Sequence, residues 1–344
     1  MLYIQETTCI SSLQSLSEVG LPEKAIVPGN KISVIEPDYS GIPEKVLRRM
    51  GKAVRLGVGS ALSLIGKAGK PDAIIIGTAN GGMEDCIKFL NQIIEYDEGM
   101  LTPTNFVQST ANAIAGQVGM MLKNTGYNIT HVHRGHSFEN SLLDAVMHLR
   151  DNPGLHVLVG AVDEISAYNF NIDSLDGWYK TGNVSSGDMY SYDSEGSFAG
   201  EGAAMFSVTS DKKETGICLE ALETITSKDP LTVTAAFNQF TQKYIGNRTD
   251  LLYMSGENGD IRMTPFYRSC EAVMESQAPV ARFKHITGEY ATASAIAVWL
   301  ACEILRTGSL PHHMLKSGSL GEPKKILIYN NHKGLQHSFI LLGL

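Results

Sequence analysis

Short apolar segments alternate with longer amphipathic segments along most of the chain, and turns containing Gly or Asn separate them. Several short segments are apolar throughout, which is typical of strands covered on both faces, whereas the longer ones repeat apolar residues at helical spacing. The predicted strands are 72–77, 127–131, 156–161, 203–209, 251–255, 326–330 and 338–342. The predicted helices are 47–65, 110–123, 138–150, 232–244 and 291–306. This alternation predicts an α/β fold with a parallel or mixed sheet.

Two sequence patterns occur twice, in the same order. Residues 72–82 read DAIIIGTANGG and residues 250–260 read DLLYMSGENGD, so both have an Asp, an apolar strand and an Asn-Gly pair. Residues 111–126 and 293–308 share Ala, Ala, Ile, Ala, Thr and Gly at matching places. The small residues of these two helices predict that both lie buried between layers. Either match alone is weak because Ala-rich helices resemble one another, but their common order and nearly equal offset favour two copies of one α/β unit.

Composition and charge exclude several classes of protein. The 344 residues are 43% hydrophobic and 19% charged, and 28 Lys and Arg against 36 Asp and Glu give a net charge of −8. Basic residues are too sparse to follow a phosphate backbone, so no nucleic acid partner is expected. No run of 18 apolar residues occurs and the polar start lacks the pattern of a signal peptide, so we expect no membrane insertion and a cytoplasmic location. The five scattered cysteines disfavour disulfide and zinc frameworks.

The segment HVHRGHS at 131–137 has the strongest signs of function, because it ends an apolar strand just before a predicted helix. His131, His133 and His136 resemble the strand-end zinc motif of metallo-β-lactamases. That motif has Asp where this chain has Gly135, and further ligands are lacking downstream, so the metal site is disfavoured and no cofactor is expected.

A second interpretation makes the segment a hydrolase site, with Ser137 as the nucleophile and His136 as its base. Adjacent residues on such a turn point apart, and no G-x-S-x-G pattern surrounds the serine. A capping role for Ser137 is therefore favoured.

Four ordered segments resemble β-ketoacyl-acyl-carrier-protein synthases. They are the nucleophile region at 101–166, the Gly-Glu-Gly-Ala-Ala stretch within 191–208, KHITGEYATASA at 284–295 and NNHKGLQHSFILL at 330–342. The resemblance implies a thiolase-like fold, with duplicated α/β halves in a layered α-β-α-β-α arrangement. We therefore expect a synthase-like N-terminal half at 1–210 and a C-terminal half at 211–344.

The residues at the family's catalytic positions depart from its pattern. Alignment on Ser137 and Ala145 places Gly135 at the position of the cysteine nucleophile, or His136 if the turn shifts by one residue. No cysteine of this chain is near this point.

The family's two catalytic histidines are also replaced, by Glu257 and by Glu289, and only Lys284 remains of the catalytic set. The loop that supplies an oxyanion N–H in the family is reduced here to a single glycine, Gly334. Two carboxylates would repel the enolate that the histidines stabilise, unless burial kept one protonated. The favoured interpretation is a structural ion pair between Lys284 and Glu289.

The same resemblance extends to chain-length factors, which are synthase-like subunits without the cysteine, and particularly to those of aryl polyene and flexirubin-type pathways. It implies a non-condensing subunit that forms a dimer with an active ketosynthase, or with itself, in fatty acid or polyketide-type biosynthesis, with an acyl carrier protein as a possible partner. The strand and elbow at 128–133, including His133, would join the partner. Phe106, Met120 and Met121 are candidates for the residues that close the acyl tunnel.

Two alternatives remain open. The first is an active 3-oxoacyl synthase or acyltransferase with a rewired site formed by His136 or Ser137, Glu257 and Glu289. The second is a nucleotide-binding module, which ranks last because neither G-x-G-x-x-G in a βαβ setting nor a P-loop pattern occurs.

Overall fold

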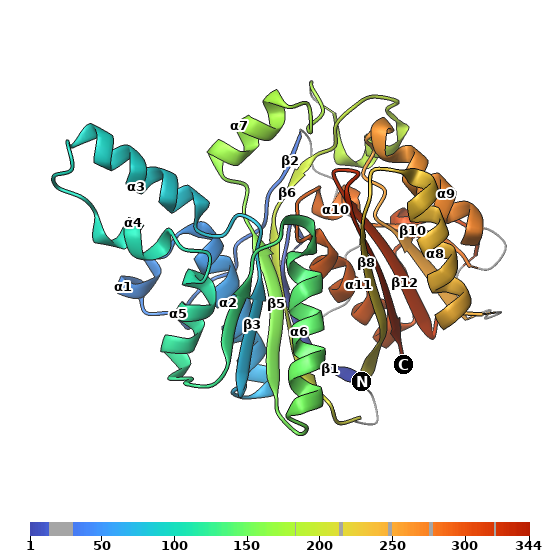
Figure 1. Cartoon of the computed structure of the whole chain (residues 1–344), viewed down its shortest axis with the longest axis horizontal. Helices are drawn as coiled ribbons and strands as arrows, with labels where there is room; N and C mark the ends of the chain where they lie inside the picture. Colours follow the sequence, from blue (N-terminus) through green and yellow to red (C-terminus); the bar gives the residue numbers. More distant parts are fainter. Residues whose placement is uncertain (14–29, 183, 213–215, 247–249, 275–277, 320) are drawn as a thin grey trace.

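Eleven strands of the computed structural model form one mixed sheet, in the order β11-β10-β9-β12-β13-β8-β1-β7-β5-β3-β4 (Figure 1). The structure describes residues 1–344 except 14–29, 183, 213–215, 247–249, 275–277 and 320. The N-terminal strands are β1 (Leu2–Ile10), β3 (Ala73–Gly77), β4 (Asn128–His131), β5 (Val157–Asp163) and β7 (Gly202–Thr209). The C-terminal strands are β8 (Ile217–Thr226), β9 (Leu251–Ser255), β10 (Val280–Arg282), β11 (Leu315–Ser317), β12 (Lys325–His332) and β13 (Gln336–Gly343). A separate pair joins β2 (Lys31–Ile32) to β6 (Ala199–Gly200).

The two sets of strands have the same topology. Apart from the extra edge strand β11, which pairs with β10, each set has five strands in the order 3-2-4-5-1 when numbered within the set, namely β4-β3-β5-β7-β1 and β10-β9-β12-β13-β8. The second strand of each set pairs parallel with the third and fourth, and the fifth pairs antiparallel with the fourth and first. The sets join where β1 runs antiparallel to β8. The structure thus confirms the predicted duplication, with β3 and β9 as equivalent strands.

The second sequence match was wrong. Helix α5 (Ala113–Leu122) lies between the second and third strands of its set, whereas α11 (Ala293–Thr307) follows the third strand. The equivalent of α11 is α6 (Ser137–Asp151), which also follows a third strand. The expectation that both Ala-rich helices are buried between layers fails for α5, because 68% of Met120 is exposed. Small residues gave the two helices a similar composition although they occupy different layers.

The helices form three layers around the two halves of the sheet. Helices α2 (Lys52–Ala68) and α5 cover the outer face of the N-terminal strands, and α8 (Pro230–Tyr244) and α9 (Thr264–Met274) cover the outer face of the C-terminal strands. Helices α6 and α11 lie between them (Figure 1). The other helices are α1 (Glu44–Leu47), α3 (Met83–Glu95), α4 (Pro103–Gln108), α7 (Ala167–Leu175) and α10 (Lys284–Thr287). The order of layers is the predicted α-β-α-β-α.

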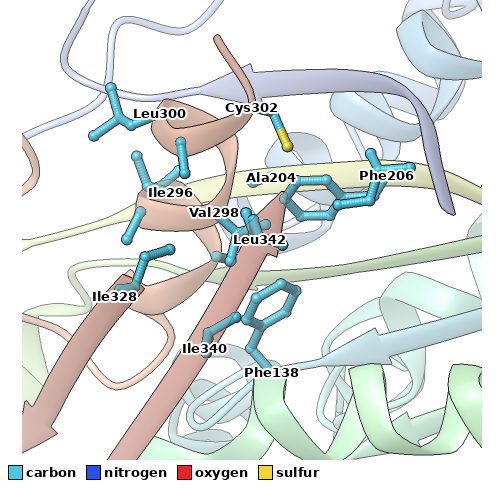
Figure 2. Packing of buried hydrophobic residues seen from close by; sticks show 14 of the residues in the cluster. Phe138, Ala204, Phe206, Ile296, Val298, Leu300, Cys302, Ile328, Ile340 and Leu342 are labelled. Carbon is cyan, nitrogen blue, oxygen red and sulfur yellow. The ribbon is translucent and has the colours of Figure 1, made fainter. Parts of the chain in front are cut away.

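Side chains alternate between these layers along each strand. In β7, Phe206 enters the central layer with Phe138 and Val298, whereas its neighbour Met205 enters the outer N-terminal layer (Figure 2). In β9, Leu252 faces the central layer and Tyr253 faces the outer C-terminal layer. Burial on both faces explains why these strands are apolar throughout.

Candidate functional site

A cavity of about 470 Å³ lies where the carboxyl ends of strands from both halves meet. The turns after β3 and β9 contribute Asn80 and Asn258, and the ends of β5 and β12 contribute Asp163 and His332. The two asparagines belong to the repeated Asn-Gly pairs of the sequence. The duplication therefore brings equivalent turns to one cavity.

The elbow after β4 contributes a single side chain to this cavity. Of residues 133–137, only Arg134 lines it. Arg134 has a φ of 51°, which is the left-handed region that residues other than glycine seldom adopt. Gly135 and His136, which the sequence places at the nucleophile position, are both buried and neither lines the cavity.

Gly135 lies between two residues of the last loop and strand. A Cβ atom added to it would come within 2.4 Å of the His332 Cβ atom. Its N–H donates a hydrogen bond to Oε1 of Gln336 at 2.9 Å. The site of the expected nucleophile thus has no room for a side chain as the loop now stands.

His136 and Ser137 have structural partners. The His136 imidazole lies 3.2 Å from the carbonyl oxygen of His337, and burial lowers its pKa. The Ser137 hydroxyl accepts from the N–H of His133 and donates to the carbonyl of Arg134, both at 2.8 Å. The capping interpretation was wrong, because His136 is at the N-cap of α6 and no side chain caps that helix. The Ser137 hydroxyl instead closes the turn before the helix, and it makes no hydrogen bond to His136 such as a nucleophile makes to its base.

Lys284, Glu289 and Asn258 form a buried network. The Lys284 ammonium lies 3.1 Å from both carboxylate oxygens of Glu289, and the Asn258 amide donates to Oε2 at 2.8 Å. Burial favours a raised pKa for Glu289, but Lys284, His332 and Asn258 together hold it below the usual value. The predicted ion pair is present, and Glu289 is a carboxylate acceptor rather than a proton donor.

Glu257 lies outside the cavity. Its carboxylate pairs with Lys316 at 2.7 Å and with Arg282 at 3.4 Å. The next residue, Asn258, is the one that lines the cavity and reaches Glu289. Sequence reasoning missed Asn258, although its place in the repeated Asn-Gly pair was a signal that could have found it.

Glu139 and Gly334 also have hydrogen-bond partners within the protein. Glu139 of α6 is fully buried and accepts from the Ser338 hydroxyl at 2.8 Å, and burial raises its pKa to about 6. Gly334 has a φ of 63°, and its N–H donates to the Asn331 side chain at 2.8 Å. That N–H is therefore already engaged within its own turn.

Of the proposed tunnel and interface residues, Met120 and Met121 lie on α5, which contacts the edge strand β4, and His133 follows that strand, whereas the Phe106 ring of α4 contacts Phe89 of α3. Within the described residues, β4 pairs only with β3. Phe106 and Met120 are 60% and 68% exposed, whereas Met121 packs against the outer N-terminal core. His133 is exposed, and its Nδ1 lies 3.0 Å from the Asn140 amide.

The three histidines of the zinc-like motif have separate partners: Asp144 at 2.8 Å from His131, Asn140 beside His133, and a backbone carbonyl beside His136. Over the residues that the structure describes, no group of three or more His, Cys, Asp or Glu side chains is arranged to hold a metal ion. Nor does any helix in that part of the chain have the length and apolar character needed to cross a membrane.

The cysteines lie outside the cavity lining in the part of the chain that the structure describes. Cys9, Cys218, Cys270 and Cys302 are buried and Cys86 is half-buried, and none appears among the described residues that line the cavity. Burial raises the pKa of Cys9 and of Cys302 to about 12. None of the described residues that line the cavity therefore offers a thiol that could carry an acyl group.

Comparisons with known proteins agree with this architecture. The sequence profile of the family described as beta-ketoacyl synthase, N-terminal domain, matches residues 23–174. No curated protein matches the sequence. The solved ketosynthase ApeO in complex with its chain length factor ApeC, from Xenorhabdus doucetiae, is 14% identical with a TM-score of 0.78, covering 100% of this chain and 98% of that chain.

Two other solved structures are similar. The ishigamide ketosynthase/chain length factor is 12% identical with a TM-score of 0.78, covering 99% of this chain and 98% of that chain. A beta-ketoacyl synthase from Burkholderia phymatum STM815 is 13% identical with a TM-score of 0.75, covering 100% of this chain and 99% of that chain. The chain thus has the thiolase-like fold of these solved structures over its whole length, and its residues 23–174 match the β-ketoacyl synthase N-terminal domain family.

Proposed function

We propose that this chain is a non-condensing subunit of the chain-length-factor type, which pairs with an active ketosynthase in fatty acid or polyketide-type biosynthesis. One observation carries the proposal. The elbow side chain that faces the cavity is the guanidinium of Arg134, and no described residue lining the cavity is a cysteine.

The remaining side chains of the cavity support a non-condensing role. Condensation requires a thiol that accepts an acyl group and donors that stabilise an enolate oxygen. Glu289 is ionised against Lys284, and the Asn258 amide already donates to that carboxylate. The Lys284 and Asn258 donors that the structure pairs are directed at a carboxylate, and an ionised carboxylate at one of the family's histidine positions would repel an enolate.

The free edge of the sheet supports the proposed partner. An edge strand offers unpaired backbone N–H and C=O groups to a strand of another chain. Around β4, Tyr127 and Val132 are 40% and 54% exposed, and Met120 and Met147 on the flanking helices are 68% and 51% exposed. An exposed edge bordered by apolar side chains is typical of an interface between subunits.

The solved ApeO ketosynthase is in complex with its chain length factor. By analogy, we propose a heterodimer with a cysteine-containing ketosynthase, in which the region around Phe106 and Met120 reaches the partner's acyl tunnel and limits the length of the product. Polyene acyl chains are the expected product class because the sequence resembles factors of aryl polyene and flexirubin-type pathways.

Incubation with acyl- and malonyl-carrier protein tests the non-condensing role. The chain is incubated alone, a candidate ketosynthase is incubated alone, and the two are incubated together. Intact-mass spectrometry is expected to show an acyl adduct only on the ketosynthase, and product analysis a changed chain length when both are present. An adduct on the chain alone, or CO₂ released by it alone, would favour the rewired enzyme instead.

A further inference from the structure

Helices α3 and α4 form an arm that projects from the N-terminal half, on the side of α5 and away from the C-terminal strands (Figure 1). Helix α3 is amphipathic, yet none of its residues is buried. It packs mainly on α4, where the Phe89 and Phe106 rings lie 5.3 Å apart. Most of the large apolar side chains that are exposed among the described residues lie between 83 and 175, a range that includes this arm. The arm therefore carries apolar surface that the chain itself leaves uncovered.

The tip of the arm, IEYDEGM at 94–100, combines apolar and acidic side chains. Ile94 and Met100 are 80% and 91% exposed. The three carboxylates of the tip are exposed as well, and none forms an ion pair with a described residue: Glu95, Asp97 and Glu98. The tip contains no basic residue. Its negative charge thus lies beside apolar groups that burial would stabilise.

The backbone of the tip has an uncommon conformation. Asp97, Glu98 and Met100 have φ values of 47°, 64° and 46°, in the left-handed region that residues other than glycine seldom adopt. The turn is closed by the N–H of Glu98, which donates to the carbonyl of Ile93 at 3.0 Å. Backbone strain of this kind concentrates at binding and catalytic sites, which supports a binding role for the tip.

The β4 edge alone is small for the pairing proposed above. Strand β4 has four residues, whereas a specific and stable interface uses about 20–30 residues and about 800 Å² on each partner. Further surface must therefore take part. The arm offers exposed apolar side chains on the same side of the molecule as α5, which flanks β4 (Figure 1).

We propose that the tip of the arm docks on the ketosynthase partner, in an apolar groove bordered by Lys or Arg side chains. The proposal rests on the proposed function and extends the partner surface beyond the β4 edge. The groove would cover Ile94 and Met100, and its cations would neutralise the unpaired carboxylates. A second copy of this chain fits the tip less well, because each copy has a net charge of −8 and the same acidic tip.

Surface plasmon resonance with an immobilised cysteine-containing ketosynthase, at low and at high salt concentration, tests the proposal. The Ile94→Gln/Met100→Asn variant removes the apolar side chains without adding charge, and Asn tolerates the left-handed backbone. It should raise the dissociation constant by about tenfold or more. The Asp97→Asn/Glu98→Gln variant should lower the association rate constant at low salt by about tenfold and weaken its dependence on salt.

Two matched controls should bind as the wild type does. Asp211→Asn/Glu322→Gln removes the same net charge from exposed residues of the C-terminal half. Leu231→Gln removes an exposed apolar side chain of α8. Thermal unfolding of each variant checks that its fold is intact.

The outcomes separate this inference from the proposed pairing. Unchanged affinity in Ile94→Gln/Met100→Asn, or an unchanged association rate in Asp97→Asn/Glu98→Gln, overturns the docking of the tip, and pairing through the β4 edge then stands if Met120→Glu still abolishes binding. Sedimentation velocity of the chain alone tests the other occupant. A dimer that Ile94→Gln/Met100→Asn dissociates would place a second copy on the tip and overturn the proposal. A wild-type chain that binds no candidate ketosynthase overturns the pairing itself, and this inference with it.

Discussion

The Cα atom of Gly135 is covered by the His332 side chain, so that a Cβ atom built on the glycine would lie 2.4 Å from the Cβ atom of His332. The two residues belong to different halves of the duplicated fold, one on the elbow after β4 and the other at the end of β12. This contact fixes the elbow against the last loop. It also means that a cysteine at position 135 cannot restore a nucleophile without moving that loop.

We therefore expect Gly135→Cys and Gly135→Ala to destabilise the protein by about 1–3 kcal/mol, because overpacking against a Cβ atom forces the backbone to shift. Urea unfolding measures the effect. Gly66→Ala in α2 is the control, since an added Cβ there meets nothing within 4 Å, and it should stabilise the helix by about 0.5–1 kcal/mol.

A double-variant cycle identifies His332 as the cause. Adding His332→Gly to Gly135→Ala removes the clashing Cβ and should recover part of the lost free energy of unfolding. Strictly additive effects of the two substitutions would contradict the contact.

Thiol reactivity distinguishes the two elbow positions. In a Cys86→Ala background, which removes the only half-buried cysteine among the described residues, Arg134→Cys should react rapidly with Ellman's reagent in the native state because residue 134 lines the cavity. Gly135→Cys should react only on unfolding, because Gly135 is buried. Equal rates for the two variants would mean that the elbow does not have the orientation described above.

The buried Glu139 carboxyl should make the free energy of unfolding depend on pH. Burial raises its pKa from 4.5 to about 6. The stability that the protonated carboxyl contributes is therefore fully present below pH 4.5 and is lost as pH rises through 6. The non-titrating Glu139→Gln variant should therefore gain about 2 kcal/mol relative to the wild type between pH 4.5 and pH 7.5. Urea unfolding at both pH values measures this difference, and a difference that does not vary with pH would refute it.

Apolar periodicity predicted the strands that are buried on both faces, such as β3 and β9, because nothing polar interrupts them. It missed β1 and β8, whose sequences LYIQETTCI and ICLEALETIT include polar or charged residues on positions that are only half-buried. Helix α3 was missed as well, and none of its residues is buried. Helices and strands that carry polar residues on a partly exposed face show little apolar periodicity, so they are hard to predict from sequence.

The site was predictable only in part. Lys284 and Glu289 are five residues apart, so their ion pair could be proposed from sequence alone. The choice between Glu257 and Asn258 depended on which side chain the turn after β9 directs inward, and the choice of Arg134 over Gly135 depended on a backbone φ of 51°. Contacts between distant segments, such as Gly135 with His332, are set by packing of the two halves.

The buried pair makes a further prediction. Lys284→Met leaves the Glu289 carboxylate buried without its cation, which should cost about 3–5 kcal/mol. The deficit should shrink as pH falls, because Glu289 without Lys284 regains the raised pKa that burial favours. In the double variant Lys284→Met/Glu289→Met most of the loss should be recovered. Urea unfolding at pH 7.5 and 5 checks both points, and a loss in the double variant as large as in the single one would show that Lys284 acts through other contacts.

The edge of the sheet gives the sharpest test of pairing. Met120→Glu places a charge on an exposed side chain of α5, which flanks β4, and a charge buried in an apolar interface costs several kcal/mol unless it is paired. It should abolish co-purification with the ketosynthase while leaving the thermal unfolding midpoint of the isolated chain unchanged. Leu231→Glu is the matched control, because Leu231 is 80% exposed on α8 in the opposite outer layer. Native mass spectrometry measures the complexes. Loss of pairing in Leu231→Glu but not in Met120→Glu would place the interface on the C-terminal strands instead of on the β4 edge.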